Sequence, residues 1–411
     1  MNITKHVTTI LLVVLGSLLS LPVFADTGRD TSKQKLPVTH KDSTKQIDLA
    51  DVMHGLFRSG VLPGSHRTQV GAKPLLSLIP LVSYSTQSRM SVLLKGNIAF
   101  RAGAASRISL VDFGTSYNQN AQFTLPIKWN IWNRANAYNF TGELKFYSYP
   151  QSTFGLGSSS TTHDRDQLNY NYLRFSGVAF RRVAGNFYAG AGYVMDNHWS
   201  IHQKADGDAD VSDFSAYGAA NHTVSSGLTL NALFDSRDNS VNPSHGFYAM
   251  SQFRQNLTAL GSTAAWNSVT LDVRKYFRFP ASSTNVLAFW SYNVLTLSGK
   301  PPYLDMPSTF WDSNNTGRGY IQGRFRGAQM VYGEAEYRYG ITANGLIGGV
   351  LFINGQSFSA APGTHFQAIQ PGYGPGLRIK LNKVSKTNIA LDYGFGHEGS
   401  RGLFLKIGEL F

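Results

Sequence analysis

Residues 136–149 read NAYNFTGELKFYSY, and their side chains alternate between apolar and polar. Phe140 and Leu144 fall on one face, whereas Glu143 and Lys145 fall on the other. Successive side chains of a β-strand point to opposite faces, so the alternation predicts a strand with one apolar and one charged face. Opposite charges at neighbouring positions, in a strand of about ten residues or more, favour a membrane-spanning strand over a strand of a soluble sandwich.

The same period of two recurs along most of the chain. It returns in NSVTLDVRKYFRF (267–279), GLRIKLN (376–382) and TNIALDYGF (387–395). Counting such segments predicts about sixteen strands, within the range of bacterial outer-membrane barrels. Their predicted first residues lie near 75, 89, 107, 120, 136, 167, 185, 223, 246, 266, 285, 327, 345, 371, 386 and 401.

Connection lengths support one barrel over residues 75–411. The long connections all follow odd-numbered strands, and they are 150–166, 201–222, 297–326 and 359–370. Bacterial barrels have long external loops and short periplasmic turns. The sequence therefore predicts an all-β fold, a transmembrane antiparallel β-barrel with both termini in the periplasm.

Three short segments precede the predicted barrel. Residues 1–25 have a positive n-region, an apolar core and the small-residue triplet VFA, as a secretory signal peptide has. Residues 26–48 are polar and aperiodic, which predicts a disordered linker. Apolar residues at helical spacing in 49–60 predict a short amphipathic helix. This helix could pack at the barrel rim or plug the lumen.

Composition narrows the possible partners and cofactors. The chain has no cysteine, which excludes a disulfide framework and cysteine-ligated metal sites. Its formal charge is +13. For an exported chain, this charge favours lipopolysaccharide phosphates, or acidic groups lining a lumen, over nucleic acid. The run Asp206, Asp208 and Asp210 has calcium-like spacing but lacks the Gly and Glu of an EF-hand loop. We therefore predict no metal and no cofactor.

Catalysis has little support in the sequence. No serine hydrolase motif occurs. The one candidate group is His198, His202 and Asp213, which could meet at the barrel rim. We therefore predict that the protein is not an enzyme.

Several motifs follow one another toward the C-terminus. They are FDSRDNSVNPSHGFYAM (234–250), TGRGYIQGRFRG (316–327), GEAEYRYG (333–340), FING (352–355), GPGLRIKLNKVSKTNIALDYGFG (374–396) and a terminal Phe411. Together they resemble the BamA/TamA superfamily of outer-membrane barrels, also called bacterial surface antigens. The resemblance covers residues 225–411. Between residues 75 and 225 only the spacing of the predicted strands supports it. Because too few residues precede the barrel for a periplasmic POTRA domain, the chain resembles a barrel-only member.

The resemblance implies a latch inside the barrel. In this family an Arg-Gly-aromatic tip on the sixth external loop folds back into the lumen, and here it would be Arg318, Gly319 and Tyr320. The arginine would meet Glu336 on the inner wall. The family's second acidic position corresponds to Asn354, which keeps an acceptor but has no charge. The latch is thus expected to use one carboxylate instead of two. From the residues alone, Arg318 could equally bind lipopolysaccharide.

The resemblance also implies a periplasmic turn and an assembly signal. The turn would consist of Asp235, Arg237, Asp238, Pro243 and Gly246. An aromatic residue that ends an alternating last strand resembles the signal by which such barrels are recognised for assembly, which would be Phe411.

The seam between the first and last strands is expected to be weak. Pro80 lies in the middle of the first strand and cannot donate to a ladder. Gly402 and Gly408 in the last strand provide no side chains to pack. A bulge at Pro80 or sideways opening of the seam would each explain this pattern.

The function expected from the resemblance is a role in outer-membrane biogenesis or translocation. The expected partners are outer-membrane lipid and lipopolysaccharide, the machinery that inserts the barrel, and unfolded protein or lipid clients. The alternatives are a passive pore and a surface-exposed interaction protein or antigen.

Overall fold

The structure is a computed structural model that describes residues 46–49, 51–52, 73–85, 89–148, 150–204, 213–310, 316–383 and 385–411. The signal peptide, nearly all of the linker and most of the predicted helix at 49–60 lie outside these residues. At its start Asp48 accepts a hydrogen bond from the Asp51 N–H at 3.1 Å, and Lys383 Nζ binds Asp51 at 2.6 Å.

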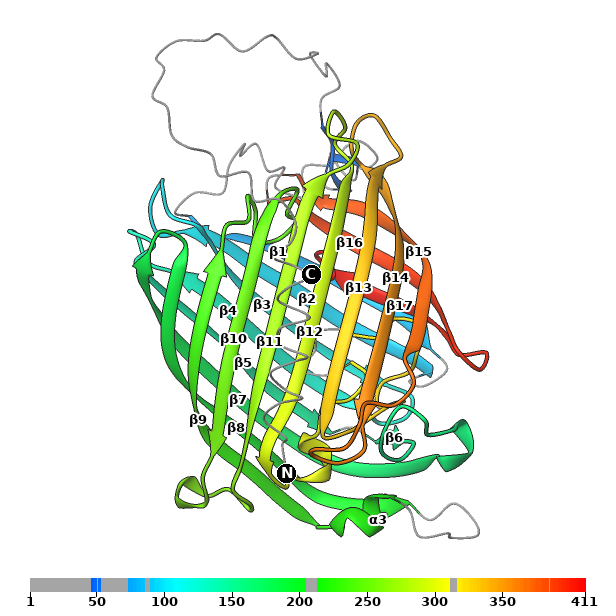
Figure 1. The fold of residues 1–411 in the computed structure, drawn as a ribbon. Helices are drawn as coiled ribbons and strands as arrows, with labels where there is room; N and C mark the ends of the chain where they lie inside the picture. The colour runs from blue at the N-terminus through cyan, green and yellow to red at the C-terminus, as the bar shows by residue number, and fades with distance from the viewer. Residues whose placement is uncertain are drawn as a thin grey trace. The chain divides into compact units, whose positions relative to one another are not determined.

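Within the described residues, seventeen strands form one antiparallel sheet (Figure 1). The first nine are β1 (Leu75–Ser85), β2 (Arg89–Arg101), β3 (Ile108–Asn118), β4 (Phe123–Trp132), β5 (Tyr138–Ser148), β6 (Gln151–Thr153), β7 (Asp166–Ala184), β8 (Phe187–Lys204) and β9 (His222–Asp235). The others are β10 (Gly246–Asn256), β11 (Trp266–Arg278), β12 (Val286–Gly299), β13 (Gln329–Gly340), β14 (Ile347–Ser359), β15 (Gln370–Asn382), β16 (Thr387–Gly396) and β17 (Arg401–Ile407).

Among the described residues that follow the start of β1, helical structure is confined to short connecting pieces. They are η1 (Thr162–Asp164), α3 (Asp213–Gly218), η2 (Thr258–Leu260) and η3 (Tyr303–Asp305). In Figure 1, α3 and β6 lie at the lower end of the strands. Within the described part of the chain, no helix is both long and apolar enough to cross a membrane.

The all-β prediction is confirmed, and each of the sixteen long strands begins within about three residues of its predicted position. The sequence missed β6, which has three residues and pairs with the start of β7. A segment this short contains too few alternations to show a period of two.

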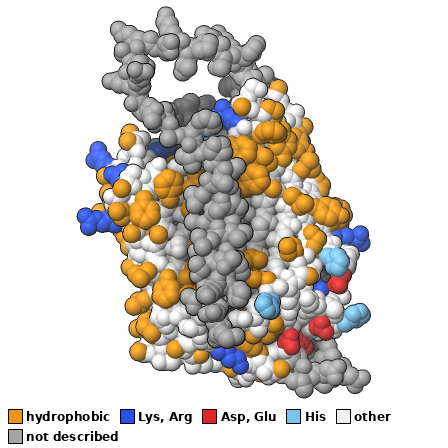
Figure 2. Space-filling model, viewed as in Figure 1, with side chains coloured by type: hydrophobic (Ala, Val, Ile, Leu, Met, Phe, Trp, Pro, Cys, Tyr) orange, Lys and Arg blue, Asp and Glu red, His pale blue; other side chains and the backbone are white. Residues whose placement is uncertain are grey.

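The alternation places apolar side chains on the outer face of the strands. In β5, Tyr138, Phe140 and Leu144 are exposed, while Glu143 and Lys145 are buried on the inner face. Figure 2 shows hydrophobic side chains spread across the outer face, with charged side chains toward its margins. This arrangement suits strands that face lipid outside and a polar lumen inside.

Each long strand pairs with the next one along the chain, from β1–β2 to β16–β17. Among the described residues no ladder joins β1 to β17, so hydrogen bonds do not close the sheet. Pro80 lies opposite Leu94 of β2 in the middle of β1, and Gly402 lies opposite Gly394 of β16. The last strand has only seven residues.

Side chains on the inner face form an aromatic core with two other segments. The inner faces of β11 to β14 contribute Tyr276, Trp290, Tyr332 and Phe358 among others. Tyr320 and Phe325 from the loop after β12, and Leu410 and Phe411 from the C-terminus, join the same cluster. The lumen beside these strands is therefore filled by folded-back chain.

Candidate functional site

The connection between β12 and β13 spans residues 300–328, of which 311–315 lie outside the described residues. Its second half, 316–327, is almost entirely buried, although it contains three arginines. Buried arginines require acceptors, because unpaired buried charge is costly. The contacts of these three side chains therefore define how the loop is held.

Arg318 is completely buried against the inner wall. Its Nη2 donates to Glu334 and Glu336 of β13, and its Nη1 donates to Asp392 of β16. The guanidinium carbon also lies 3.6 Å from the ring centroid of Phe352. A planar guanidinium has five donors in a fixed fork, so a single arginine can serve several carboxylates at once.

The expectation of one carboxylate is wrong, because the guanidinium contacts three. Asn354 has a different role from the one expected of an acidic residue at this position. Its Nδ2 donates to the backbone carbonyl of Arg318 at 3.0 Å. The amide therefore holds the main chain of the loop tip, where a carboxylate could not donate.

These groups belong to a larger charge cluster. We use this name for Arg318, Arg338, Arg378, Glu334, Glu336, Asp392 and Glu409. Within it Arg338 binds Glu336 at 2.7 Å, and Arg378 binds both Asp392 at 2.5 Å and Glu409 at 2.8 Å. Three cations thus face four carboxylates, and each buried charge has an opposite charge beside it. Such mutual pairing offsets the cost of removing these groups from water.

The backbone of the loop tip touches the wall directly. Gly319 has a φ of 112°, and a Cβ added there would lie 2.4 Å from the carbonyl oxygen of Phe395. A Cβ added to Gly394 would lie 2.6 Å from the Gly319 nitrogen. Glycine is needed at both positions, because any side chain would separate the loop from β16.

Tyr320 completes the tip through its hydroxyl and its ring. The hydroxyl donates to the Pro371 carbonyl at 2.6 Å and accepts from the His397 N–H at 2.8 Å. The ring packs edge-on against Phe325, with 5.2 Å between centroids. Arg318, Gly319 and Tyr320 are thus fixed by β13, β15 and β16, and by the turn that follows β16.

The other two arginines bind connecting segments. Arg324 donates to the Ser160 carbonyl at 2.9 Å and to Glu398 at 3.1 Å. Arg326 Nη1 donates to the carbonyls of Tyr303 and Met306 at 3.1 and 3.2 Å. Arg324 thus ties the folded-back loop to the connections before β7 and after β16, and Arg326 ties its second half to its own first half.

The C-terminus turns back into the lumen after β17. Gly408 has a φ of 94°, which allows the turn, and Glu409 then enters the charge cluster. The Phe411 ring stacks on Trp290, with centroids 5.1 Å apart, and its carbonyl accepts from Arg338 at 3.0 Å. The alternation of Leu403, Leu405 and Ile407 alone would place Glu409 in the same outward row, but its side chain binds Arg378 on the inner side, because the strand ends at Ile407.

The predicted turn residues form a compact ionic unit between β9 and β10. Arg237 binds Asp235 through two nitrogens at 2.9 and 3.0 Å. Burial raises the pKa of Asp238, but hydrogen bonds from Ser244 and His245 more than offset this effect and hold it below its ordinary value. Pro243 and Gly246 close this turn, and Gly246 has a φ of 114°.

The three side chains weighed for catalysis have separate partners. His198 Nδ1 lies 3.4 Å from Asp305, His202 bonds Asn169 at 3.2 Å, and Asp213 accepts from the Leu156 N–H at 2.7 Å. The Asp206–Asp210 run lies outside the described residues.

Comparisons with known proteins agree with this architecture. Residues 97–407 match the model of the Omp85 superfamily domain. Among curated proteins, none matches the sequence. The fold is similar to BamA from Haemophilus ducreyi lacking POTRA domains 1–3, with a TM-score of 0.50 and 12% identity over 82% of this chain and 70% of that one. It is also similar to CdiB from Acinetobacter baumannii, with a TM-score of 0.51 and 11% identity over 81% of this chain and 59% of that one.

The family match extends over the strands that hold the charge cluster, the folded-back loop and the turn between β9 and β10. The chain therefore belongs to the Omp85 superfamily of outer-membrane β-barrels.

Proposed function

We propose that the protein acts in outer-membrane biogenesis or translocation by opening the seam between β1 and β17 to clients. The observation that carries this proposal is that the ladder runs from β1 to β17 in chain order without a described pairing between these two strands. Backbone groups facing lipid require partners. Two strands at such an edge can therefore bind the edge of another polypeptide.

Because folded-back chain fills part of the lumen, the proposal takes clients through the seam and not through the centre of the barrel. The loop at 316–327 and the C-terminal residues occupy the inner face of β11 to β14. β17 is short and ends at the Gly408 turn, so it offers few residues to pair with β1. A passive pore would need an unobstructed central path, and no contact of the loop favours that alternative.

The same proposal covers location and partners. It places the barrel in the outer membrane, both termini in the periplasm, and the loops near lipopolysaccharide. The clients would be unfolded protein segments that add strands at the seam, and the cell's assembly machinery would insert this barrel itself.

Crosslinking the seam tests the proposal. Leu78 in β1 and Leu403 in β17 both project outward, and the chain has no native cysteine. Liposomes that contain the Leu78→Cys/Leu403→Cys protein are expected to speed the insertion of an unfolded client barrel. Crosslinking the two cysteines is expected to reduce insertion to the rate of protein-free liposomes, and a reducing agent is expected to restore it.

The matched control crosslinks an existing ladder. Ile353 and Tyr373 face each other across β14 and β15 and are both exposed, so Ile353→Cys/Tyr373→Cys is expected to leave insertion unchanged. Equal insertion with the β1–β17 pair open and crosslinked, or no acceleration by the wild-type protein, would contradict the proposal.

A further inference from the structure

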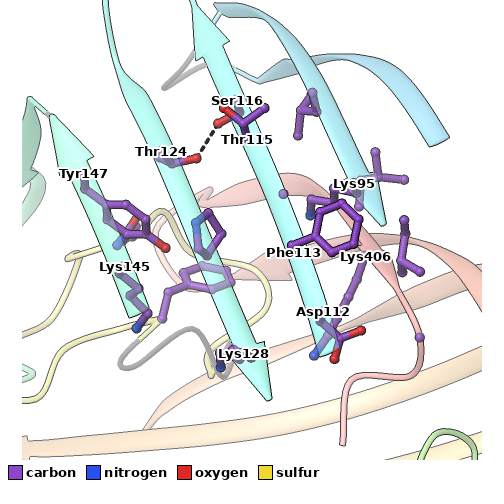
Figure 3. A pocket seen from close by; sticks show the side chains of 18 of the residues that line it. Lys95, Asp112, Phe113, Thr115, Ser116, Thr124, Lys128, Lys145, Tyr147 and Lys406 are labelled. Carbon is purple, nitrogen blue, oxygen red and sulfur yellow. Dashed lines mark hydrogen bonds between the residues drawn. The ribbon is translucent and has the colours of Figure 1, made fainter. Parts of the chain in front are cut away.

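A cavity of about 650 Å³ lies along the inner face of β2 to β5 and reaches β17 and the folded-back loop. Figure 3 shows Lys95 from β2, Asp112 from β3, Lys128 from β4 and Lys406 from β17 around it. A volume of this size is typical of sites for small ligands. It can hold a small molecule or a lipid headgroup.

Positive charge dominates the lining. Seven lysine and arginine residues border the cavity, against two acidic residues, Asp112 and Glu409. Glu409 is already bound by Arg378 within the charge cluster. Asp112 is therefore the acidic group that remains to balance the basic groups at this wall.

Several of the basic side chains already have acidic partners. Glu143 binds Lys128 at 3.2 Å and Lys145 at 2.7 Å, and Asp272 binds Arg274 at 2.6 Å. Glu143 also binds Arg174, which has a second carboxylate partner in Asp196. These ion pairs compensate part of the positive charge of the lining, and the remaining basic side chains have no carboxylate partner of this kind in the described part of the chain.

The remaining basic residues are Arg326, which backbone carbonyls already hold, and two lysines, Lys95 and Lys406. Within the described residues neither lysine has a carboxylate within ion-pair distance, and Lys406 Nζ donates only to the Leu410 carbonyl at 2.9 Å. Two ammonium groups next to each other repel unless an anion lies between them. Both residues line the same cavity (Figure 3).

The wall beside these lysines is partly apolar. Phe113 and Leu110 of β3 and Leu93 of β2 line it. The cavity also borders Leu405 of β17, so it lies next to the seam. The lining therefore offers a ligand both polar and apolar contacts.

We propose that this cavity binds a phosphate group, held by the ammonium groups of Lys95 and Lys406. A phosphate monoester carries a charge of about −1.5 to −2 near neutral pH, which matches two lysines better than a carboxylate does. The apolar wall favours an amphiphile over free phosphate as the source. This site does not depend on client insertion at the seam, because binding is measured on the purified protein.

The test is a calorimetric titration of the full chain folded in dodecyl maltoside micelles. The probes are dodecyl phosphate and inorganic phosphate. The wild-type protein is expected to bind dodecyl phosphate saturably, and binding is expected to weaken as salt rises. The Lys95→Gln/Lys406→Gln variant is expected to bind about a hundredfold more weakly, because each of the two lost charged hydrogen bonds is worth about a factor of ten.

A charge-matched variant controls for the net charge. Arg181 and Arg182 are exposed at the end of β7 and do not line the cavity, so Arg181→Gln/Arg182→Gln is expected to bind as wild type does. The single variant Lys95→Gln keeps the Lys406–Leu410 hydrogen bond and is expected to weaken binding in a folded protein.

Tighter binding of dodecyl phosphate than of inorganic phosphate identifies an amphiphile, and equal binding identifies free phosphate. The proposal is overturned if neither probe binds, or if the lysine variants bind as tightly as the control.

Discussion

Replacing Arg318 with alanine is expected to lower the free energy of unfolding by about 3–5 kcal/mol. The substitution leaves Glu334, Glu336 and Asp392 buried around the position of the lost guanidinium. Glu334 then has no arginine partner among the described residues, whereas Glu336 and Asp392 keep Arg338 and Arg378. A buried carboxylate without a partner is costly, and the loop tip also loses its main attachment to β13 and β16. Urea unfolding of the protein in micelles, together with its heat resistance on gels, measures the loss.

The stability losses of single and double variants distinguish an arginine that binds three carboxylates from an arginine that binds Glu336 alone. If Arg318 paired with Glu336 alone, Arg318→Ala and Glu336→Gln would cost the same. With three carboxylates, Glu336→Gln is expected to cost clearly less, because Glu334 and Asp392 still hold the arginine. The double variant is expected to cost less than the sum, since both changes affect one cluster. Equal single losses, or fully additive ones, would contradict this arrangement.

Replacing Phe411 with alanine is expected to cost about 3 kcal/mol, within the usual range for a large buried aromatic side chain. Phe411 is buried, stacks on Trp290 and contacts Tyr276 at 6.1 Å between centroids. The loss is expected when the purified, already folded protein is unfolded in micelles. Leu260→Ala, at an exposed position in η2, provides the control and is expected to change little.

This measurement also separates two roles of the terminal aromatic. If Phe411 served solely as an assembly signal, its replacement would reduce insertion in cells but leave the stability of the folded protein unchanged. The packing of Phe411 in the lumen predicts a loss of stability in vitro. Unchanged unfolding of Phe411→Ala would show that the aromatic contacts contribute nothing to the fold.

The strands could be predicted because each one repeats a period of two over many residues. In β11, for example, Asp272 and Arg274 alternate with Leu271 and Val273, and one face must be buried in lipid. The turns could be placed because the alternation stops at them. The three-residue β6 could not be found in this way, since it depends on pairing with β7.

The loop tip could be predicted, but its full set of partners could not. Glu334 and Glu336 lie close to Arg318 in sequence and share one face of a strand. Asp392 lies 74 residues away and reaches the arginine only through the register of β13 to β16. The alternation alone does not predict the inward position of Glu409, because the left-handed turn at Gly408 ends the alternation. Nothing else in the sequence around Gly408 marks this turn.

Conductance tests whether the folded-back loop, held at its tip by the inner wall, blocks a central path, as the proposed route through the seam requires. Single-channel recordings in planar bilayers compare the wild type with Arg318→Ala and Gly319→Ala. The second variant removes no charge but places a Cβ 2.4 Å from the Phe395 oxygen. Gly345→Ala is the matched control, because Gly345 also has a positive φ, 70°, but open space around it.

If the loop blocks the lumen, the wild type and Gly345→Ala have low conductance, whereas Arg318→Ala and Gly319→Ala show long-lived openings. A large, steady conductance of the wild type that neither tip variant changes would contradict it.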